Sequence, residues 1–199
     1  MKEIYIIALS IGLFLTGCAD SSSTSWHDAC LNEAYLKLKV EKDVKSRTLL
    51  NRYVHMLSAV ARGRDIDAKD VDGSTLLILA VRNEDVRAVN ELTGPKFFAE
   101  SSCQDSSGMS ALRYAVQSKN IEIIRRLVEI GTDLDLKDNQ HGRTALIDAV
   151  LLKDVETIKV LVEAGASVEI KDNSGKSARD YAYLNGEIAT LNMLSKERK

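Results

Sequence analysis

The fold is decided by the stretch Asp72-Gly73-Ser74-Thr75-Leu76-Leu77-Ile78-Leu79-Ala80, which returns three more times along the chain. The further copies run over 107–115, 141–149 and 174–182, so the period lies between 33 and 35 residues. A glycine, a hydroxyl residue and a closing alanine keep their places in every copy: Gly73, Gly108, Gly142 and Gly175; Thr75, Ser110, Thr144 and Ser177; Ala80, Ala115, Ala149 and Ala182. A fixed period of this length is typical of a stacked-repeat protein rather than of a compact enzyme fold.

Each repeat is predicted to contain a turn, a first helix, a short connection and a second helix. The glycine supplies the turn, and the hydroxyl accepts a hydrogen bond from the free amides of the starting helix. The second helices carry apolar residues three apart: Val86/Val89/Leu92, Ile121/Ile124/Leu127, Val155/Ile158/Leu161 and Ile188/Leu191/Leu194. Gly131 and Gly165 suit the left-handed position that ends such helices. A single repeat could not bury its apolar stripe, so the stack is needed for folding.

These features resemble the ankyrin repeat family, whose motif Gly-x-Thr-Pro-Leu-His-x-Ala is followed by a second helix that runs into Gly-Ala-Asp-Val-Asn. Gly165-Ala166-Ser167-Val168-Glu169 and Gly131-Thr132-Asp133-Leu134-Asp135 match that ending. The resemblance implies an all-α solenoid with four recognisable repeats, at about 70–104, 105–137, 138–171 and 172–196. An irregular first unit at about 26–69 is expected to have helices within 26–41 and 46–61.

The chain departs from the family motif in every copy. Leu76, Ala111, Ala145 and Ala178 replace the proline, while Ile78, Arg113, Ile147 and Asp180 replace the histidine. These family positions serve helix initiation and a local hydrogen bond, so the departures put stability in question more than the fold. Arg179 and Asp180 also make the last unit more polar, as a terminal cap requires.

The connection that follows Leu92 is irregular. Pro95 disfavours helical conformation at Gly94, so the second helix of this unit is expected to stop early. Phe97 and Phe98 either fold back onto the stack or lie exposed. We expect them to fold back, because burying two aromatic rings is strongly favourable.

The first 17 residues are predicted to be a signal peptide outside the fold, because the apolar run 4–15 is too short to span a bilayer. Leu15-Thr16-Gly17-Cys18 resembles a bacterial lipobox, which implies that Cys18 carries acyl chains; an ordinary signal peptide with an incidental cysteine is the alternative. Ala19 stands where aspartate would retain a lipoprotein at the inner membrane. The resemblance therefore implies an outer-membrane lipoprotein facing the periplasm, with residues 18–25 as a flexible, polar tether.

Two cysteines remain after Cys18, and in an oxidising compartment Cys30 and Cys103 are predicted to form a disulfide. Two unpaired thiols are the competing interpretation. His27 and Cys30 are spaced as metal ligands, but no second pair completes a site, so neither a metal nor another cofactor is predicted. The 27 basic and 29 acidic residues argue against nucleic acid as a partner. Without a catalytic motif, no enzyme activity is predicted.

In ankyrin proteins the partner usually meets the turn tips and the inner ends of the first helices. The resemblance implies the following contact residues: Val71, Asp72, Ser74, Arg82, Asn83, Ser106, Ser107, Met109, Gln117, Ser118, Asn139, Gln140, His141, Arg143, Leu151, Leu152, Asn173, Lys176 and Leu184. The pair Leu151-Leu152 matters most, because such a site is generally polar unless something covers it. Alternatively, one of the two leucines packs beneath the next repeat.

We therefore expect a non-catalytic, lipid-anchored protein that binds another protein and is a monomer when unbound. The most concrete hypothesis is an immunity protein that inhibits a toxic effector delivered to the periplasm, such as a phospholipase of the type VI secretion system. A small lipoprotein with a recognition fold and no catalytic motif motivates this hypothesis. The alternatives are an envelope scaffold or stress-protective factor that binds a resident periplasmic protein, and an uncharted hydrolase.

Overall fold

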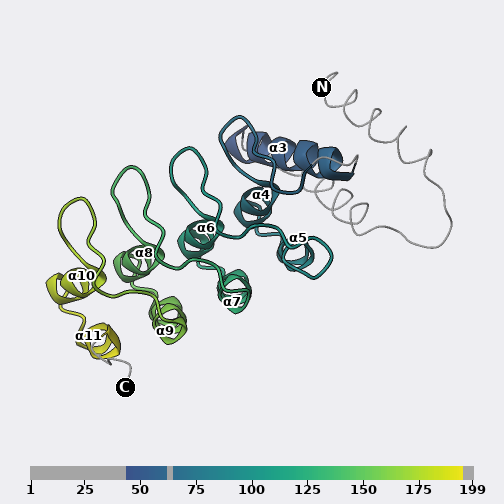
Figure 1. The fold of residues 1–199 in the computed structure, drawn as a ribbon. Coiled ribbons are helices and arrows are strands. Elements are labelled where there is room, and N and C mark those ends of the chain that lie inside the picture. The colour runs from purple at the N-terminus through teal and green to yellow at the C-terminus, as the bar shows by residue number, and fades with distance from the viewer. Residues whose placement is uncertain (1–43, 62–64, 195–199) are drawn as a thin grey trace.

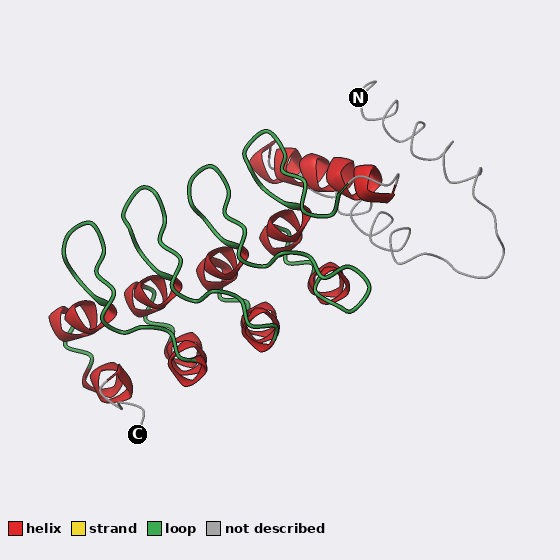
Figure 2. Cartoon of the chain, in the orientation of Figure 1, coloured by secondary structure: helices red, strands yellow, loops and turns green. Residues whose placement is uncertain are grey.

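The helices stack into two rows, with the connecting loops projecting to one side (Figure 1). The structure is a computed structural model that describes residues 44–61 and 65–194. The helices of these ranges are α3 (Val44–Ala61), α4 (Leu76–Arg82), α5 (Val86–Leu92), α6 (Ala111–Ser118), α7 (Ile121–Glu129), α8 (Ala145–Leu151), α9 (Val155–Ala164), α10 (Ala178–Leu184) and α11 (Ile188–Leu194). Within the same ranges, all remaining chain is loop or turn (Figure 2). The predicted signal peptide, Cys18, the tether, the helix within 26–41 and Cys30 lie outside the described residues.

The first helices begin at the hydroxyl residues that the repeat singled out. Thr75 accepts a hydrogen bond from the amide of Ile78, and Ser110, Thr144 and Ser177 make the same contact in their own repeats. The second helices α5, α7 and α9 begin in the same way at Asp85, Asn120 and Asp154. Because these side chains satisfy amides that have no partner inside the helix, helices of only seven to ten residues can form.

The core runs along the whole stack as a continuous apolar cluster. Each first helix packs against the next one, along α4, α6, α8 and α10, and the second helices α5, α7, α9 and α11 do the same. The closing alanines of the motif are completely buried, which allows the first helices to approach closely, and the second helices bury the apolar residues Val89, Leu92, Ile124, Leu127, Ile158 and Leu161. The predicted stack is therefore confirmed, whereas the stripe is confirmed in part, because Val155 and Ile188 at the start of their helices are exposed.

The first described helix differs from the rest. α3 has 18 residues, and its buried side chains include Tyr53, Met56 and Leu57. It packs against α4. The hydroxyl of Tyr53 donates a hydrogen bond of 3.0 Å to Asp85, the residue that caps α5. The predicted second helix of the irregular first unit is thus present, and it covers α4 on the side opposite α6.

The repeat at about 70–104 contains the irregular connection that was expected from Pro95. α5 ends at Leu92, and the amide of Ala99 donates to the carbonyl of Leu92 at 2.9 Å. In the next two repeats, the amides of Thr132 and Ala166 make the same bond after a connection two residues shorter. Phe98 therefore stands where the other repeats have Gly131 and Gly165, and like them it has a positive φ, of 50°.

The expectation that both phenylalanines fold back onto the stack is wrong for Phe98, whose side chain is 73% exposed. Phe97 is half-buried. The left-handed backbone explains the difference, because a side chain at this place points away from the core: a Cβ built on Gly131 meets no atom within 4 Å.

The last repeat was predicted to have a polar outer face, and the structure shows a mixed one. Asp180 and Ser177 form a capping box, and Arg179 donates to the carbonyl of Leu194. The outer face is nevertheless not uniformly polar, since Tyr183, Leu184 and Ile188 are exposed. In the preceding repeats the equivalents of Tyr183 are Val81, Val116 and Val150, and all three are completely buried by the next first helix. These apolar residues are exposed because, within the described residues, no further helix pair packs against α10 and α11.

Candidate binding surface

Four loop tips, which we call the fingers, stand in one row before the first helices: residues 70–74, 105–109, 138–143 and 172–176 (Figure 1). An aspartate begins each finger and shapes it. The carboxylate of Asp105 accepts hydrogen bonds from the amides of Ser107 and Met109, at 2.8 and 3.0 Å. Asp70, Asp138 and Asp172 bind the amides of their own fingers in the same way. The finger backbones are thus held by buried or half-buried carboxylates.

Neighbouring fingers are joined by main-chain hydrogen bonds. The amide of Ser106 donates to the carbonyl of Asp72 at 2.9 Å, that of Asn139 to Ser107 at 3.1 Å, and that of Asn173 to His141 at 2.8 Å. Gly108 shows why the repeat needs glycine: its φ is 76°, and a Cβ would come within 2.7 Å of the backbone nitrogen of Asn139. The fingers therefore form one connected row rather than separate loops.

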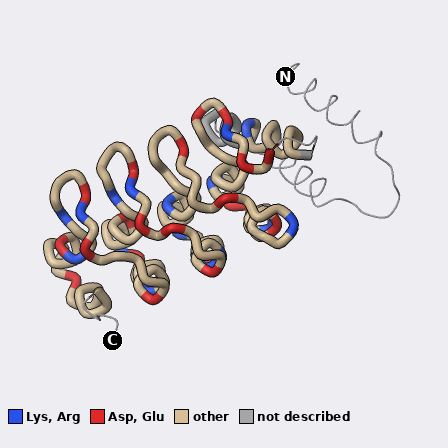
Figure 3. The backbone as a smooth tube through the Cα atoms, viewed as in Figure 1, with Lys and Arg blue, Asp and Glu red and all other residues tan. Residues whose placement is uncertain are grey.

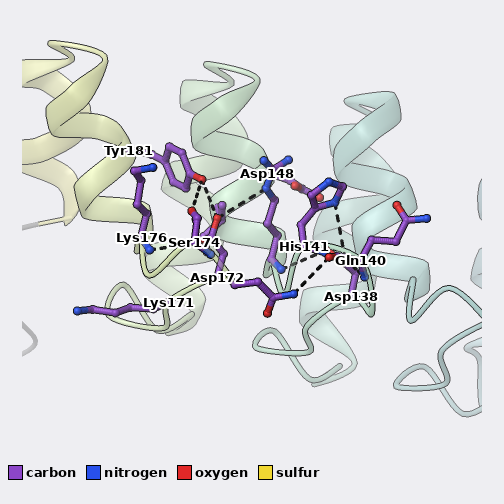
Figure 4. A network of polar contacts seen from close by, with 12 residues as sticks. Asp138, Gln140, His141, Asp148, Lys171, Asp172, Ser174, Lys176 and Tyr181 are labelled. Carbon is purple, nitrogen blue, oxygen red and sulfur yellow. Dashed lines mark hydrogen bonds and ion pairs between the residues drawn. The ribbon is translucent and has the colours of Figure 1, made fainter.

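The second oxygen of each finger aspartate has a partner from outside the finger. Tyr114 donates to Asp105 and Tyr181 donates to Asp172, each at 2.6 Å; Figure 4 shows the latter contact. Arg52 of α3 donates to Asp70. These contacts tie the base of each finger to a helix.

The third finger uses a buried ion-pair cluster instead of a tyrosine. Arg113, from the preceding repeat, places its guanidinium 2.7 Å from Asp138, and its Nε donates to Asp148 at 2.9 Å. All three side chains are buried. Asp148 stands at the place that Tyr114 and Tyr181 occupy in their repeats. Arg113 itself replaces the family's histidine, so this departure from the motif produces a bond between two repeats.

The carboxylates of Asp138 and Asp172 are charged over the physiological pH range. Burial raises the pKa of Asp138, but the amide of His141 and the charge of Arg113 outweigh it and hold that pKa at about 2. In Asp172, burial is likewise outweighed by the hydroxyls of Tyr181 and Ser174, which lower the pKa. Burial and the hydrogen bond to Asp105 raise the pKa of Tyr114 to about 12. These carboxylates and this phenol serve to hold the fingers in shape.

Most of the predicted contact residues lie where a partner could reach them. Among the predicted residues, the exposed ones on the fingers are Val71, Asp72, Ser106, Ser107, Asn139, Gln140, His141 and Asn173, and those at the ends of the first helices are Gln117, Ser118 and Leu184. Partly buried are Arg82, Asn83, Met109, Arg143, Leu151, Leu152 and Lys176. Ser74 is completely buried, so its inclusion was wrong. The aspartates that begin the fingers are not among the predicted residues, although an aspartate stands three or four residues before each repeat glycine.

The leucine pair does not form an exposed apolar patch. Leu151 ends α8 and Leu152 caps it, and both side chains pack partly against the core. The interpretation in which the next repeat covers them fits better than that of an open contact patch. The apolar side chains exposed near the fingers are instead Val71, which is 92% exposed, and Leu184.

Two shallow hollows separate the first three fingers. The hollow between the first and second fingers has a volume of about 290 Å³ and is lined by Val71, Asp72 and Tyr114. The guanidinium of Arg82 lies over the ring of Tyr114. The hollow between the second and third, of about 160 Å³, contains Gln140 and His141 above the buried Arg113 cluster. Such hollows can receive side chains of a partner protein.

Charge is unevenly distributed along the row (Figure 3). The first finger contains Asp70 and Asp72, adjoins Lys69 and pairs with Arg52, whereas the last two contain one aspartate each and carry or adjoin four basic residues: Lys137, Arg143, Lys171 and Lys176. Asp138 and Asp172 stay ionised because their pKa values are lowered, so the negative charge buried at the base of these fingers is permanent at neutral pH. The ammonium groups and guanidinium of the four basic residues still reach the solvent side, since the side chains are exposed or half-buried.

The described residues contain no group of three or more His, Cys, Asp and Glu side chains that could hold a metal ion. Cys103 is partly buried and has no disulfide partner within the described residues, and the pKa of its thiol is raised by burial and by Asp67. Its proposed partner Cys30 lies outside the described ranges, so the disulfide stays a prediction. Over the described part of the chain, no helix combines the length and apolar character needed to cross a membrane.

The fold and the row of fingers are typical of proteins that bind other proteins. Comparison with known proteins gives the family. Residues 49–138 match a family model described as ankyrin repeats in three copies, and residues 141–173 match the ankyrin repeat. Together the matches cover more than half of the sequence, and the chain belongs to the ankyrin repeat family. Its repeats indicate a module for protein–protein interaction.

One relative, described as Neurogenic locus notch homolog protein 1 of Danio rerio, is 37% identical over 79 residues. The matched stretch covers 40% of this chain and only 3% of that protein. The similarity therefore concerns a few repeats and not the rest of the relative.

Proposed function

We propose that this protein is a lipid-anchored component of the bacterial envelope that inhibits a toxic secreted enzyme, in the manner of an immunity protein. A phospholipase delivered by a type VI secretion system is the most concrete candidate for the enzyme. The observation that carries the proposal is the row of bonded fingers, because it offers side chains for recognition on a backbone that is already fixed. Lipidation at Cys18 would keep the inhibitor beside the membrane on which such an enzyme acts.

The fixed finger backbone favours tight binding. The main-chain bonds between fingers and the carboxylates that begin them use the amides internally, which leaves Val71, Gln140 and His141 directed toward a partner. Binding then orders few backbone groups, so little of the interaction energy is lost as conformational entropy. An inhibitor that must hold its target tightly benefits from this fixed backbone.

The charges of the fingers restrict the kind of partner. An acidic first finger and basic last fingers fit a protein that presents the opposite signs in the same order. Complementary charges raise the rate of association and exclude partners with like charge. We therefore expect association to slow as the ionic strength rises.

The test is a pull-down from periplasmic and secreted fractions of the producing organism, with residues 19–199 as bait. We expect to recover a secreted enzyme whose activity falls as bait is added. Val71→Glu combined with His141→Glu should weaken both recovery and inhibition, since both side chains are exposed on the fingers. Glu122→Arg, on the exposed face of α7, is the matched control that should change neither.

Other outcomes distinguish the alternatives. Recovery of resident envelope proteins alone, lost in the same finger variant, would favour an envelope scaffold over an immunity protein. Inhibition that survives the finger variant but fails in Glu122→Arg would place the binding surface on the second helices, which contradicts the role of the fingers.

A further inference from the structure

We propose that Phe98 and the loop 93–99 around it contact the surface of a lipid bilayer. This inference rests on the proposed lipid anchor at Cys18. It assigns a second, membrane-facing side to the protein, separate from the fingers. The argument begins with the backbone of Phe98.

Phe98 occupies a left-handed position that the equivalent places of the next two repeats fill with glycine. A side chain here costs backbone strain, and it gains little from packing because the phenyl ring is 73% exposed. The amide of Phe98 donates to the carbonyl of Gly94, a bond that glycine could make equally well. Folding therefore gives no reason for a phenylalanine at this place.

The neighbours of Phe98 have the chemistry of a membrane-interface contact. Pro95 and Lys96 are exposed, and the ammonium group of Lys96 lies 5.2 Å from the centre of the Phe97 ring. Aromatic rings enter the boundary between headgroups and acyl chains, while a neighbouring lysine reaches the phosphates. Glu91 and Glu100 are also exposed beside the loop, so insertion of the ring, rather than net charge, has to carry the contact.

The position of the loop favours a bilayer over the partner protein. The loop follows α5 in the second row of helices, away from the side on which the fingers project (Figure 2). A protein seated on the fingers would leave it free. The loop also belongs to the repeat that directly follows α3, so it lies toward the end of the stack that Cys18 precedes in sequence. An anchor there would hold this end of the stack near the bilayer.

The experiment uses the full-length lipidated protein in vesicles of phosphatidylethanolamine and phosphatidylglycerol. Trp26 is the single tryptophan, so Trp26→Phe gives a silent background for Phe98→Trp. Tyr183→Trp in the same background is the matched control, because Tyr183 is 74% exposed in the last repeat. With brominated lipids, we expect Phe98→Trp to lose emission and shift to shorter wavelength, while Tyr183→Trp does neither.

Three results would overturn the inference. Equal quenching of the two tryptophans, or quenching of neither, would show that the loop makes no specific contact with lipid. Protection of Phe98→Trp from a soluble quencher by the recovered partner, without vesicles, would assign the loop to a protein instead. Intact mass separates this failure from that of the anchor: an unacylated Cys18 overturns both proposals, whereas an acylated protein without quenching overturns only the loop contact.

Discussion

The finger side of the stack and the side of the second helices differ in how regularly their contacts repeat. On the finger side, the same contacts return from repeat to repeat: an aspartate holds the finger, and an amide donates to the preceding finger. On the side of the second helices, the connection after α5 is two residues longer than those after α7 and α9, and it carries Phe98 in place of glycine.

The difference follows from what each side must contact. A finger bonds to its neighbour through backbone atoms, and a Cβ on Gly73 or Gly108 would strike the following finger, so these glycines are fixed by geometry. In the connection after α5 only part of the chain packs against the stack, and Phe98 is 73% exposed, so the two additional residues and the exposed ring are tolerated there. We therefore expect the finger side to carry much of the stability, and the other side to accept changes at little cost.

The largest effect should come from Arg113→Met at the base of the third finger. The substitution leaves Asp138 and Asp148 buried without their cation, so the free energy of unfolding should fall by about 3–5 kcal/mol. Urea unfolding followed by circular dichroism measures the loss. A loss below about 1 kcal/mol would mean that the cluster is not a structural bond between repeats.

A double variant tests whether a tyrosine can replace the lost cation at the base of the third finger. In Arg113→Met with Asp148→Tyr, the introduced tyrosine can donate to Asp138 as Tyr114 does to Asp105 and Tyr181 to Asp172. We expect the double variant to recover most of the stability. Failure to recover would show that the third finger needs the cation itself.

Acid should weaken the finger side next. The pKa of Asp138 is about 2 in the folded chain, below its usual 3.8, so the unfolded state binds more protons between these values. Stability is present above pH 4 and is lost as the pH falls through about 2, by on the order of 2 kcal/mol for this residue. The lowered pKa of Asp172 acts in the same direction. Urea titrations across this range, with Asp138→Asn as control, should show a shallower pH dependence in the variant; an unchanged slope would contradict the assignment.

The finger contacts also show how much a sequence can reveal. The period identified the glycines, the capping hydroxyls and the closing alanines, because each serves a local need that recurs in every repeat. Arg113 was recognised only as a departure from the motif, and its contact with Asp148 was missed, because the two residues meet only when the repeats are stacked, 35 residues apart. Phe98 was misplaced for a different reason: the period puts Lys96 opposite Gly131, and the inserted residues shift that alignment.

Two glycines with the same backbone conformation separate strain from contact. Gly108 and Gly175 have φ values of 76° and 77°, but a Cβ on Gly108 would strike Asn139, whereas one on Gly175 meets nothing within 4 Å. Gly175→Ala should therefore cost only the left-handed strain, about 1 kcal/mol, and Gly108→Ala about 2 kcal/mol. Thermal and urea unfolding measure both; equal losses would remove the finger contact from the explanation.

The smallest effect, and the one of opposite sign, is expected at Phe98. Phe98→Gly removes left-handed strain and an exposed ring, while the greater freedom of glycine in the unfolded chain offsets part of the gain. The free energy of unfolding should not fall, and should rise by up to about 1 kcal/mol. Phe98→Ala is the matched control, because it removes the ring and keeps the strain, so the difference between the two variants in urea unfolding reports the strain less the unfolded-state entropy of glycine. If both variants lost more than about 1 kcal/mol, the ring would be stabilising the stack, and the two sides would not differ as described.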